Sequence, residues 1–368
     1  MNMIYLYSKN IFRKGEIRMD KKMTVEDLLN MEGNKIPTDI KSYSMLIHAP
    51  GKTGKTTLVH ELYGEKVIML ASERRHSHLA NVHVINIDNY GDYLRAMKLL
   101  TKDERIKDKY SAICIDTIGR LESYILDHVL SKLNIESLGD LAYGAAYAEF
   151  NKELEKALRL IEHSGFTPIF IAHSKTEVQK VLVDDASDVE KSSDTATVVR
   201  DKKDGKQYVE YEKTVPDIRK KFENMIARIV DNVLFLSSTV DSNGVESRKI
   251  FYRDTPSHTA GASFKGMPEY TELSAKAYKE AMEKAIRAEG SENLEEGKRE
   301  QSQGVEYDYE QLMSEIAELG KKLQADGKAD ERNKVIEEVL GKGNKVKDTK
   351  PEQVEVSAVL VDKLKEIA

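Results

Sequence analysis

The sequence has very little cysteine, proline and tryptophan. Its 368 residues include one cysteine, seven prolines and no tryptophan. A disulfide needs two cysteines and a cysteine-rich zinc site needs more, so the lone Cys114 excludes both within one chain. The low proline content and the 40% hydrophobic fraction exclude a collagen-like or wholly disordered chain. The composition indicates a globular protein of a reducing compartment, which predicts a cytoplasmic location.

Long apolar runs are missing as well. No stretch approaches the roughly 18 to 20 apolar residues that a membrane-spanning helix needs, so we expect no membrane contact. The first 270 residues hold 40 Lys or Arg and 40 Asp or Glu, whereas the residues from Thr271 onward hold 17 and 23. A neutral body with an acidic tail is not typical of a protein that binds nucleic acid over its whole surface. Any such contact must come from a local patch.

Strand and helix patterns alternate through residues 44–288. This alternation predicts an α/β fold, with a mostly parallel sheet and helices on both faces. The predicted strands cover 45–48, 66–71, 82–87, 111–116, 168–172, 233–237 and 249–252. The predicted helices cover 58–63, 90–100, 118–133, 142–163 and 271–288. The remaining parts are an N-terminal extension (1–43), an acidic linker (289–305) and a small helical C-terminal module (306–368).

The strongest motif is APGKTGKTT, residues 49–57, between a predicted strand and a predicted helix. It matches the phosphate-loop pattern G-x-x-x-x-G-K-[ST] except at the first glycine position, which holds Ala49. Glycines allow backbone N–H groups to surround a phosphate, and the helix N-terminus adds a partial positive charge. We expect Lys55 to reach the β- and γ-phosphates and Thr56 to offer its hydroxyl to Mg²⁺. The alternative is a plain Gly/Lys-rich turn. The predicted nucleotide-binding set is Pro50, Gly51, Lys52, Thr53, Gly54, Lys55, Thr56 and Thr57.

Three polar side chains follow or end predicted strands, at the sheet edge where ligands bind. Asp116 ends the fourth strand and is expected to hold Mg²⁺; alternatively it caps the next helix. Glu73 follows the second strand and could orient or deprotonate the attacking water; alternatively it is a solvated carboxylate beside Arg74. His173 follows the fifth strand and could sense the γ-phosphate; alternatively its polar groups are satisfied locally.

Taken in chain order, these residues and the long polar segment after His173 resemble the RecA-like P-loop ATPase core. The stretches AYGAAYAEF, IFIAHSK and FYRDTPSHTAGASFKGMPE are similar to its phage branch, the AAA-type ATP-binding proteins associated with single-strand annealing and recombination. The resemblance covers about residues 44–269. It implies ATP and Mg²⁺ as cofactors; the implied roles are catalysis for Lys55, Glu73 and His173, and metal binding for Thr56 and Asp116. Ala49 and the large insertion after His173 depart from the family pattern.

The insertion, residues 175–221, is polar and is expected to form a long loop or a hairpin. Its second half, residues 200–221, holds eight Lys or Arg against five Asp or Glu and includes Tyr208 and Tyr211. Cations bind phosphates and aromatic rings stack on bases, so the pattern favours nucleotide-gated binding of single-stranded DNA. A solvated hairpin whose tyrosines pack on its own body fits the interleaved acidic residues equally well.

Cations also gather near the end of the predicted core. In oligomeric ATPases a cation from the neighbouring subunit completes the site, so a ring or filament of identical chains is expected; ordinary edge-strand charges are the alternative. These cations are Arg248, Lys249, Arg253 and Lys265. The C-terminal module could bind a replication or recombination protein or nucleic acid, or could only solubilise the chain or dock on its body.

The sequence therefore predicts a Mg²⁺-dependent ATPase that binds single-stranded DNA during phage or mobile-element recombination or replication, in the cytoplasm of a bacterial host. The alternative is an ATP-state switch or loader that acts on a protein partner and hardly touches DNA.

Overall fold

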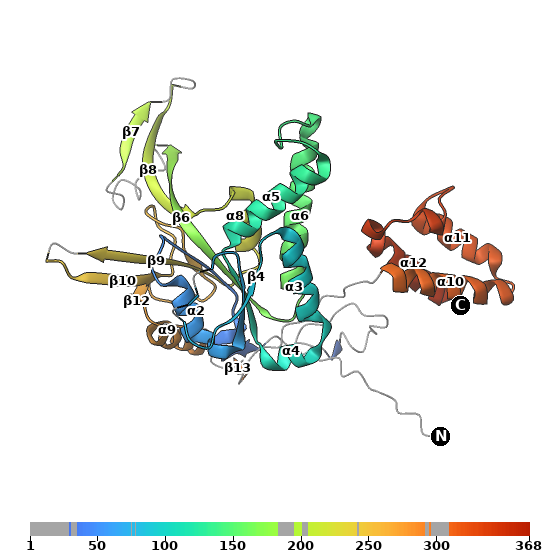
Figure 1. Ribbon diagram of the computed structural model, residues 1–368, viewed down its shortest axis with the longest axis horizontal. Helices are drawn as coiled ribbons and strands as arrows, with labels where there is room; N and C mark the ends of the chain where they lie inside the picture. The colour runs from blue at the N-terminus through green and yellow to red at the C-terminus, as the bar shows by residue number, and fades with distance from the viewer. Residues whose placement is uncertain are drawn as a thin grey trace. The chain divides into compact units, whose positions relative to one another are not determined.

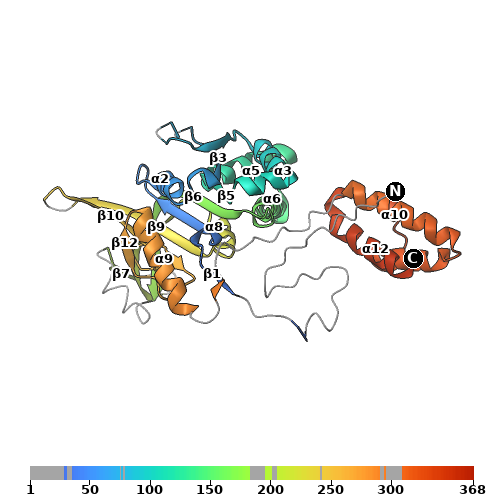
Figure 2. The same ribbon diagram turned by 90° about the horizontal axis from the view of Figure 1, so that it is seen from below.

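The computed structural model describes residues 29–30, 35–74, 76–77, 79–182, 195–200, 205–240, 243–290, 294–295 and 309–368. They belong to two compact units: the first lies within residues 32–303, and the second holds residues 309–368 with the pair 29–30. Figures 1 and 2 show the first unit as a sheet covered by helices and the second as a small group of helices.

The first unit is built on a mostly parallel sheet with the strand order β12-β10-β9-β2-β6-β5-β3-β4. The six strands from β9 to β4 run parallel, and β10 and β12 are antiparallel at one edge. Parallel strands covered on both faces need apolar side chains on both, which explains continuous runs such as VIMLA and AICID. The predicted α/β class is confirmed. The strands are β2 (Met45–Ala49), β3 (Val67–Ala71), β4 (His83–Asn86), β5 (Ala112–Asp116), β6 (Thr167–Leu182), β9 (Asn232–Val240), β10 (Glu246–Phe251) and β12 (Tyr270–Glu272), and the short β11 (Gly261–Ala262) pairs with β9.

Two apolar cores lie on opposite faces of this sheet. Helices α2 and α9 contribute to one core, and α3, α5, α6 and α8 contribute to the other. In α6, for example, Phe150, Leu154 and Leu158 recur at helical spacing and are all buried. The helices are α2 (Lys55–Tyr63), α3 (Tyr90–Lys102), α4 (Glu104–Lys109), α5 (Ile118–Leu133), α6 (Ala145–Glu162), α8 (Lys220–Ala227) and α9 (Ala275–Glu289).

The largest difference from the sequence analysis is at β6. The strand predicted for 168–172 continues to Leu182, where its second half pairs with β8 (Gln207–Pro216), which in turn pairs with β7 (Thr197–Arg200). We call residues 174–182, 197–200 and 207–216 the arm. Of the two expected forms, a long loop or a hairpin, the structure has the hairpin, with β7 as an added strand. Most arm side chains stay in contact with water, so the polar composition resembled a loop; among the arm residues only Val209, Val215 and Pro216 are buried.

The first unit also extends beyond the predicted boundaries at 44 and 288. Strand β1 (Ile36–Pro37) pairs in parallel with β13 (Leu294–Glu295). Ile40 and Tyr43 are buried in the core that contains α2 and α9. Part of the predicted extension and part of the predicted linker therefore belong to the unit. Both segments are too short to show a strand pattern.

The second unit consists of α10 (Tyr309–Ala325), α11 (Ala329–Leu340) and α12 (Val354–Ile367). Its core gathers apolar side chains mainly from α10 and α12, among them Ile316, Leu323, Leu360 and Leu364. The helical appendage expected at the C-terminal end is thus present. No helix in the described parts of either unit has the length and apolar character needed to cross a bilayer.

Candidate nucleotide-binding site

The segment 50–54 forms a tight loop between β2 and the N-terminus of α2. Gly54 has φ of 101°, a left-handed conformation that strains residues with a Cβ atom. Lys52 is also left-handed, with φ of 64°. The Thr53 hydroxyl donates to the Pro50 carbonyl oxygen at 2.9 Å, which ties the loop across its base. The backbone N–H groups at the start of α2 have no partner within the helix, so they are available to an anion.

Ala49 explains why the first glycine of the pattern is dispensable here. It is the last residue of β2, fully buried, and it pairs in register with His173 of β6. Its backbone is regular extended strand, which an alanine adopts without strain. The loop therefore needs no glycine until after the strand has ended.

The Lys55 ammonium is held inside this loop. Its Nζ donates to the carbonyl oxygens of Ala49 at 3.0 Å and Pro50 at 2.9 Å, and only 6% of the residue is exposed. Burial lowers the pKa of Lys55, and the nearby carboxylates of Asp116 and Glu73 partly oppose that effect. A desolvated cation with only carbonyl oxygens as acceptors is well suited to bind phosphate oxygens.

Thr56 and Asp116 meet beside the loop. The Thr56 hydroxyl donates to Oδ2 of Asp116 at 2.8 Å, although β5, which carries Asp116, is separated from β2 by β6. Asp116 does not cap α5: the N-cap residue is Thr117, and no side chain caps that helix. A hydroxyl and a carboxylate at this distance form the hard oxygen ligand pair that Mg²⁺ prefers, so the donor set fits this metal.

Glu73 and His173 form a second pair at the same sheet edge. Nε2 of His173 lies 3.0 Å from Oε1 of Glu73, and both side chains are partly open to solvent, at 40% and 27%. Glu73 comes two residues after the end of β3, and His173 lies in β6 beside the end of β2. The structure therefore brings Glu73, which follows β3, into direct contact with His173, which lies within β6 and not after it as expected, because that strand continues to Leu182.

Two residues of this site escaped the sequence analysis. Nε2 of His76 lies 3.4 Å from Oδ2 of Asp116. Ser72 makes three hydrogen bonds to the end of β5 and the residue after it. Its N–H and its hydroxyl donate to the Asp116 carbonyl oxygen at 2.8 and 3.3 Å, and the hydroxyl accepts from the Thr117 N–H at 3.1 Å. Both follow β3, as Glu73 does. Their position just after β3 was the only signal in the sequence. That position does not show which side chains turn toward the neighbouring strand β5.

The cations predicted to act on a neighbouring subunit mostly have partners in their own chain. Arg248 pairs with Glu246 at 2.8 Å, and the Lys249 ammonium lies 4.0 Å from the ring centroid of Tyr270. Arg253 donates to the carbonyl oxygens of Lys265 and Met267. These three cations are thus engaged locally near one edge of the sheet, Arg248 and Lys249 in β10 and Arg253 just after it.

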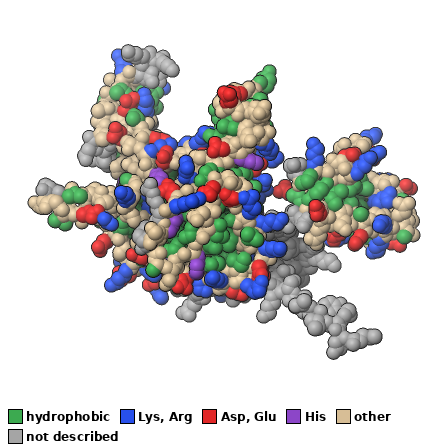
Figure 3. Space-filling model, viewed as in Figure 1, with side chains coloured by type: hydrophobic (Ala, Val, Ile, Leu, Met, Phe, Trp, Pro, Cys, Tyr) green, Lys and Arg blue, Asp and Glu red, His purple; other side chains and the backbone are tan. Residues whose placement is uncertain are grey.

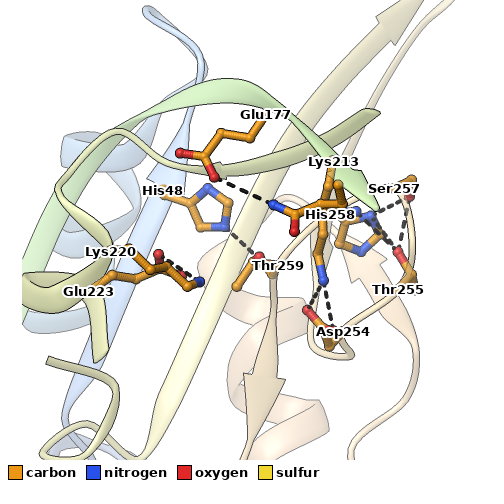
Figure 4. Close-up of polar contacts among 11 residues, drawn as sticks. His48, Glu177, Lys213, Lys220, Glu223, Asp254, Thr255, Ser257, His258 and Thr259 are labelled. Carbon is orange, nitrogen blue, oxygen red and sulfur yellow. Dashed lines mark hydrogen bonds and ion pairs between the residues drawn. The ribbon is translucent and has the colours of Figure 1, made fainter. Parts of the chain in front are cut away.

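Several cations of segment 200–221 are likewise engaged. Lys213 binds Asp254 at 2.8 Å (Figure 4), Lys220 binds Glu223 at 3.0 Å, and Arg219 lies 3.8 Å from Glu122. Tyr211 packs against Val209 in the small core of the arm. Figure 3 shows acidic and basic side chains interspersed over the visible face of the first unit. Lys202 and Lys203 lie outside the described residues. We call Lys213 and the segment 217–223, where the arm joins α8, the arm base; it carries mixed, paired charge.

A buried histidine supports the strand that leads into the phosphate loop (Figure 4). His48 lies in β2, and its Nε2 lies 2.6 Å from the Thr259 carbonyl oxygen. Its Nδ1 lies 2.8 Å from the Ser174 hydroxyl. Burial lowers the pKa of His48 to about 4. The ring is therefore neutral in the folded protein at pH 7 and fixes β2 against β6 and the loop after β10.

This shift makes the stability of the first unit depend on pH. In the unfolded chain His48 takes up a proton near pH 6.5, whereas in the folded chain it does so only near 4. The free energy of unfolding should therefore fall as the pH drops below 6.5, by about 2 kcal/mol between pH 7 and 5 from this residue. Urea unfolding of wild type and His48→Gln at both pH values measures it: the variant should lose less stability on acidification. Equal losses would contradict the assignment.

Comparisons with known proteins agree with this geometry. A family model described as "AAA domain" matches residues 41–264, more than half of the chain. The chain is also 28% identical over 358 residues to the SPbeta prophage-derived uncharacterized protein YorG of Bacillus subtilis strain 168, an alignment that covers 93% of this chain and 98% of that protein. The matched region contains β2, the phosphate loop, Glu73, Asp116 and His173. The chain therefore belongs to the AAA-domain family.

Proposed function

We propose that this protein is a Mg²⁺-dependent ATPase that acts with single-stranded DNA in phage recombination or replication. The observation that carries the ATPase assignment is the convergence of the buried Lys55 ammonium, the Thr56–Asp116 pair and the Glu73–His173 pair at one edge of the sheet. Membership of the AAA-domain family supports it.

Each residue has a role that follows from its chemistry. Lys55 and the loop N–H groups bind the phosphates, and Thr56 and Asp116 hold the metal. When bound, Mg²⁺ neutralises charge on the phosphate oxygens. Glu73 accepts a proton from, or orients, the attacking water. His173, bonded to Glu73, fixes the direction of that carboxylate and responds to the group in front of it.

The RecA-like branch is part of the proposal. The strand order places β6, which carries His173, between the strand of the phosphate loop and the strand of Asp116. In the sequence, the order of phosphate loop, Glu73, Asp116 and His173 resembles that branch. The same strand β6 then continues into the arm. His173, the proposed sensor of the γ-phosphate, and the first part of the arm therefore belong to one strand.

Single-stranded DNA as the effector is supported by the phage setting. The similar YorG protein is prophage-derived, and recombination and replication are the phage processes in which a cytoplasmic ATPase meets single strands. Assembly into a ring or filament of identical chains remains part of the proposal.

A second candidate is favoured by one specific observation. At the arm base, Lys213, Arg219 and Lys220 are already near carboxylates of this chain. Paired cations release fewer counterions from a nucleic acid, so they add little affinity for it. The second candidate is a nucleotide-state switch or loader that acts on a protein partner.

One measurement separates the two candidates. Steady-state ATP hydrolysis is followed with and without a long single-stranded oligonucleotide at low and moderate salt. The proposal predicts stimulation of about tenfold or more, and the stimulation should weaken as salt rises. Slow hydrolysis that ignores the oligonucleotide would support the protein-directed switch instead. Absence of hydrolysis under every condition would contradict both.

A further inference from the structure

The second unit carries an unusually basic connection between α11 and α12. Residues 341–350, here called the basic loop, contain Lys342, Lys345, Lys347 and Lys350 but a single acidic residue, Asp348. All four lysines are exposed. Among the described residues, none of their ammonium groups has an acceptor within hydrogen-bonding or ion-pair distance. This concentration of charge lies in a unit that is otherwise acidic.

Three lysines elsewhere in the same unit are arranged differently. Lys363 pairs with Glu338, Lys365 pairs with Glu315, and Lys328 donates to the carbonyl oxygen of Ile367. Those contacts join α12 to the other helices and stabilise the bundle. Thr349 of the basic loop accepts a hydrogen bond from Tyr309 of α10, but the four lysines make no such contact, so the mutual repulsion of their like charges is not offset within the described part of the unit.

The basic loop also lines a hollow. A cavity of about 460 Å³ lies between the loop and the last turns of α11. Lys342 and Lys345 stand at its wall, while Ile336 and Val346 supply its apolar part. Gly343, also on the wall, has φ of 84°, and a Cβ built there would meet nothing within 4 Å. The main chain is therefore open to close approach by a ligand.

We propose that the basic loop and this cavity bind the sugar-phosphate backbone of single-stranded nucleic acid. Unpaired lysines on an irregular loop provide the charge, and the exposed backbone of Gly343 adds one N–H donor for a phosphate oxygen. No aromatic side chain lines the cavity, so the contact does not stack bases and is independent of sequence. A peptide partner would need buried apolar anchors, and Ile336 and Val346 are too few to supply them.

The proposal rests on the DNA part of the proposed function and not on the ATPase site. It assigns to the C-terminal unit a strand contact that the paired arm cations do not supply. The phosphate loop binds a nucleotide, whereas the basic loop would hold the polymer on which the ATPase acts.

The test compares two double variants of the full chain. Lys342→Ala with Lys345→Ala removes two cavity lysines, and Lys321→Ala with Lys322→Ala removes two exposed lysines of α10. Binding of fluorescent oligothymidine is measured by anisotropy from low to moderate salt. The logarithm of affinity falls with the logarithm of salt by about 0.7 for each single-strand phosphate contact. The loop pair should therefore reduce the slope by about 1.4, and the α10 pair should leave it unchanged.

A third variant should act in the opposite direction. Glu337 stands on the cavity wall with its negative charge. Glu337→Gln should tighten oligothymidine binding by about two- to fivefold, because it removes a like charge near the phosphates. A structural role for Glu337 would weaken binding or leave it unchanged.

Each outcome has a defined meaning. Equal slopes for wild type and the loop pair, or equal losses for both pairs, would overturn this inference and leave the ATPase assignment intact. Wild type that binds neither oligothymidine nor a duplex would overturn the inference together with the DNA part of the proposed function. Preference for the duplex at the basic loop would overturn the single-strand assignment. ATP hydrolysis without DNA should be the same in all of these variants.

Discussion

Lys55→Met is expected to reduce ATP hydrolysis by a factor of about 10² to 10³ or more while the protein stays folded. The ammonium supplies the charge inside the loop, and methionine keeps most of the side chain's length without it. Because the cation is buried and burial lowers its pKa, removal of the charge also relieves a desolvation cost. The melting temperature should therefore change by only a few degrees. The measurement is steady-state phosphate release together with thermal unfolding.

Lys52→Met is the matched control for that variant. Lys52 lies in the same loop and is exposed. Its backbone is left-handed, and because lysine and methionine are both unbranched at Cβ, the substitution does not change the strain there. Its loss should change hydrolysis by less than about tenfold. If Lys55→Met kept near-normal turnover, the phosphate loop would not be the catalytic site.

Glu73→Gln should separate nucleotide binding from turnover. Glutamine preserves the size of the side chain and can still contact Nε2 of His173, but it cannot accept a proton from water. A lost general base costs about 10² to 10⁴ in rate, so hydrolysis should fall by that range while ATP binding changes little. Equilibrium binding of a fluorescent ATP analogue and single-turnover hydrolysis test the two halves of this prediction.

Glu65→Gln provides the comparison. Glu65 is an exposed acidic residue just before β3, whereas Glu73 lies just after it. The exposed variant should behave as wild type. Comparable turnover in Glu73→Gln and wild type would assign water activation to another group, and a loss of ATP binding in Glu73→Gln would give Glu73 a binding role instead.

The sheet could be predicted because its central strands are buried on both faces. Runs such as VIMLA and AICID carry apolar side chains on both faces of the strand, so their burial follows from composition alone. The phosphate loop could be predicted because its chemistry depends on a short stretch of backbone. Glu73, Asp116 and His173 could be placed at one edge because parallel strands share their carboxyl ends.

Contacts between distant segments could not be predicted in the same way. His48 looks like an interruption in an apolar strand until Ser174 and Thr259 are brought to its two nitrogens. The arm has polar side chains on most positions, so period-two alternation gave no apolar face to detect. His76 reaches Asp116 only because the chain after β3 turns back over the end of β5.

The pairing of β1 with β13 has a practical consequence for fragments of this protein. A fragment that stops with α9 at Glu289 would leave Ile36–Pro37 without a neighbouring strand and would expose the apolar surface that Leu294 covers. A fragment that runs from before Ile36 to beyond Glu295 keeps both ends joined to each other. Limited proteolysis should therefore give a first stable fragment whose C-terminus lies after residue 295. A fragment designed for crystallisation should end there as well.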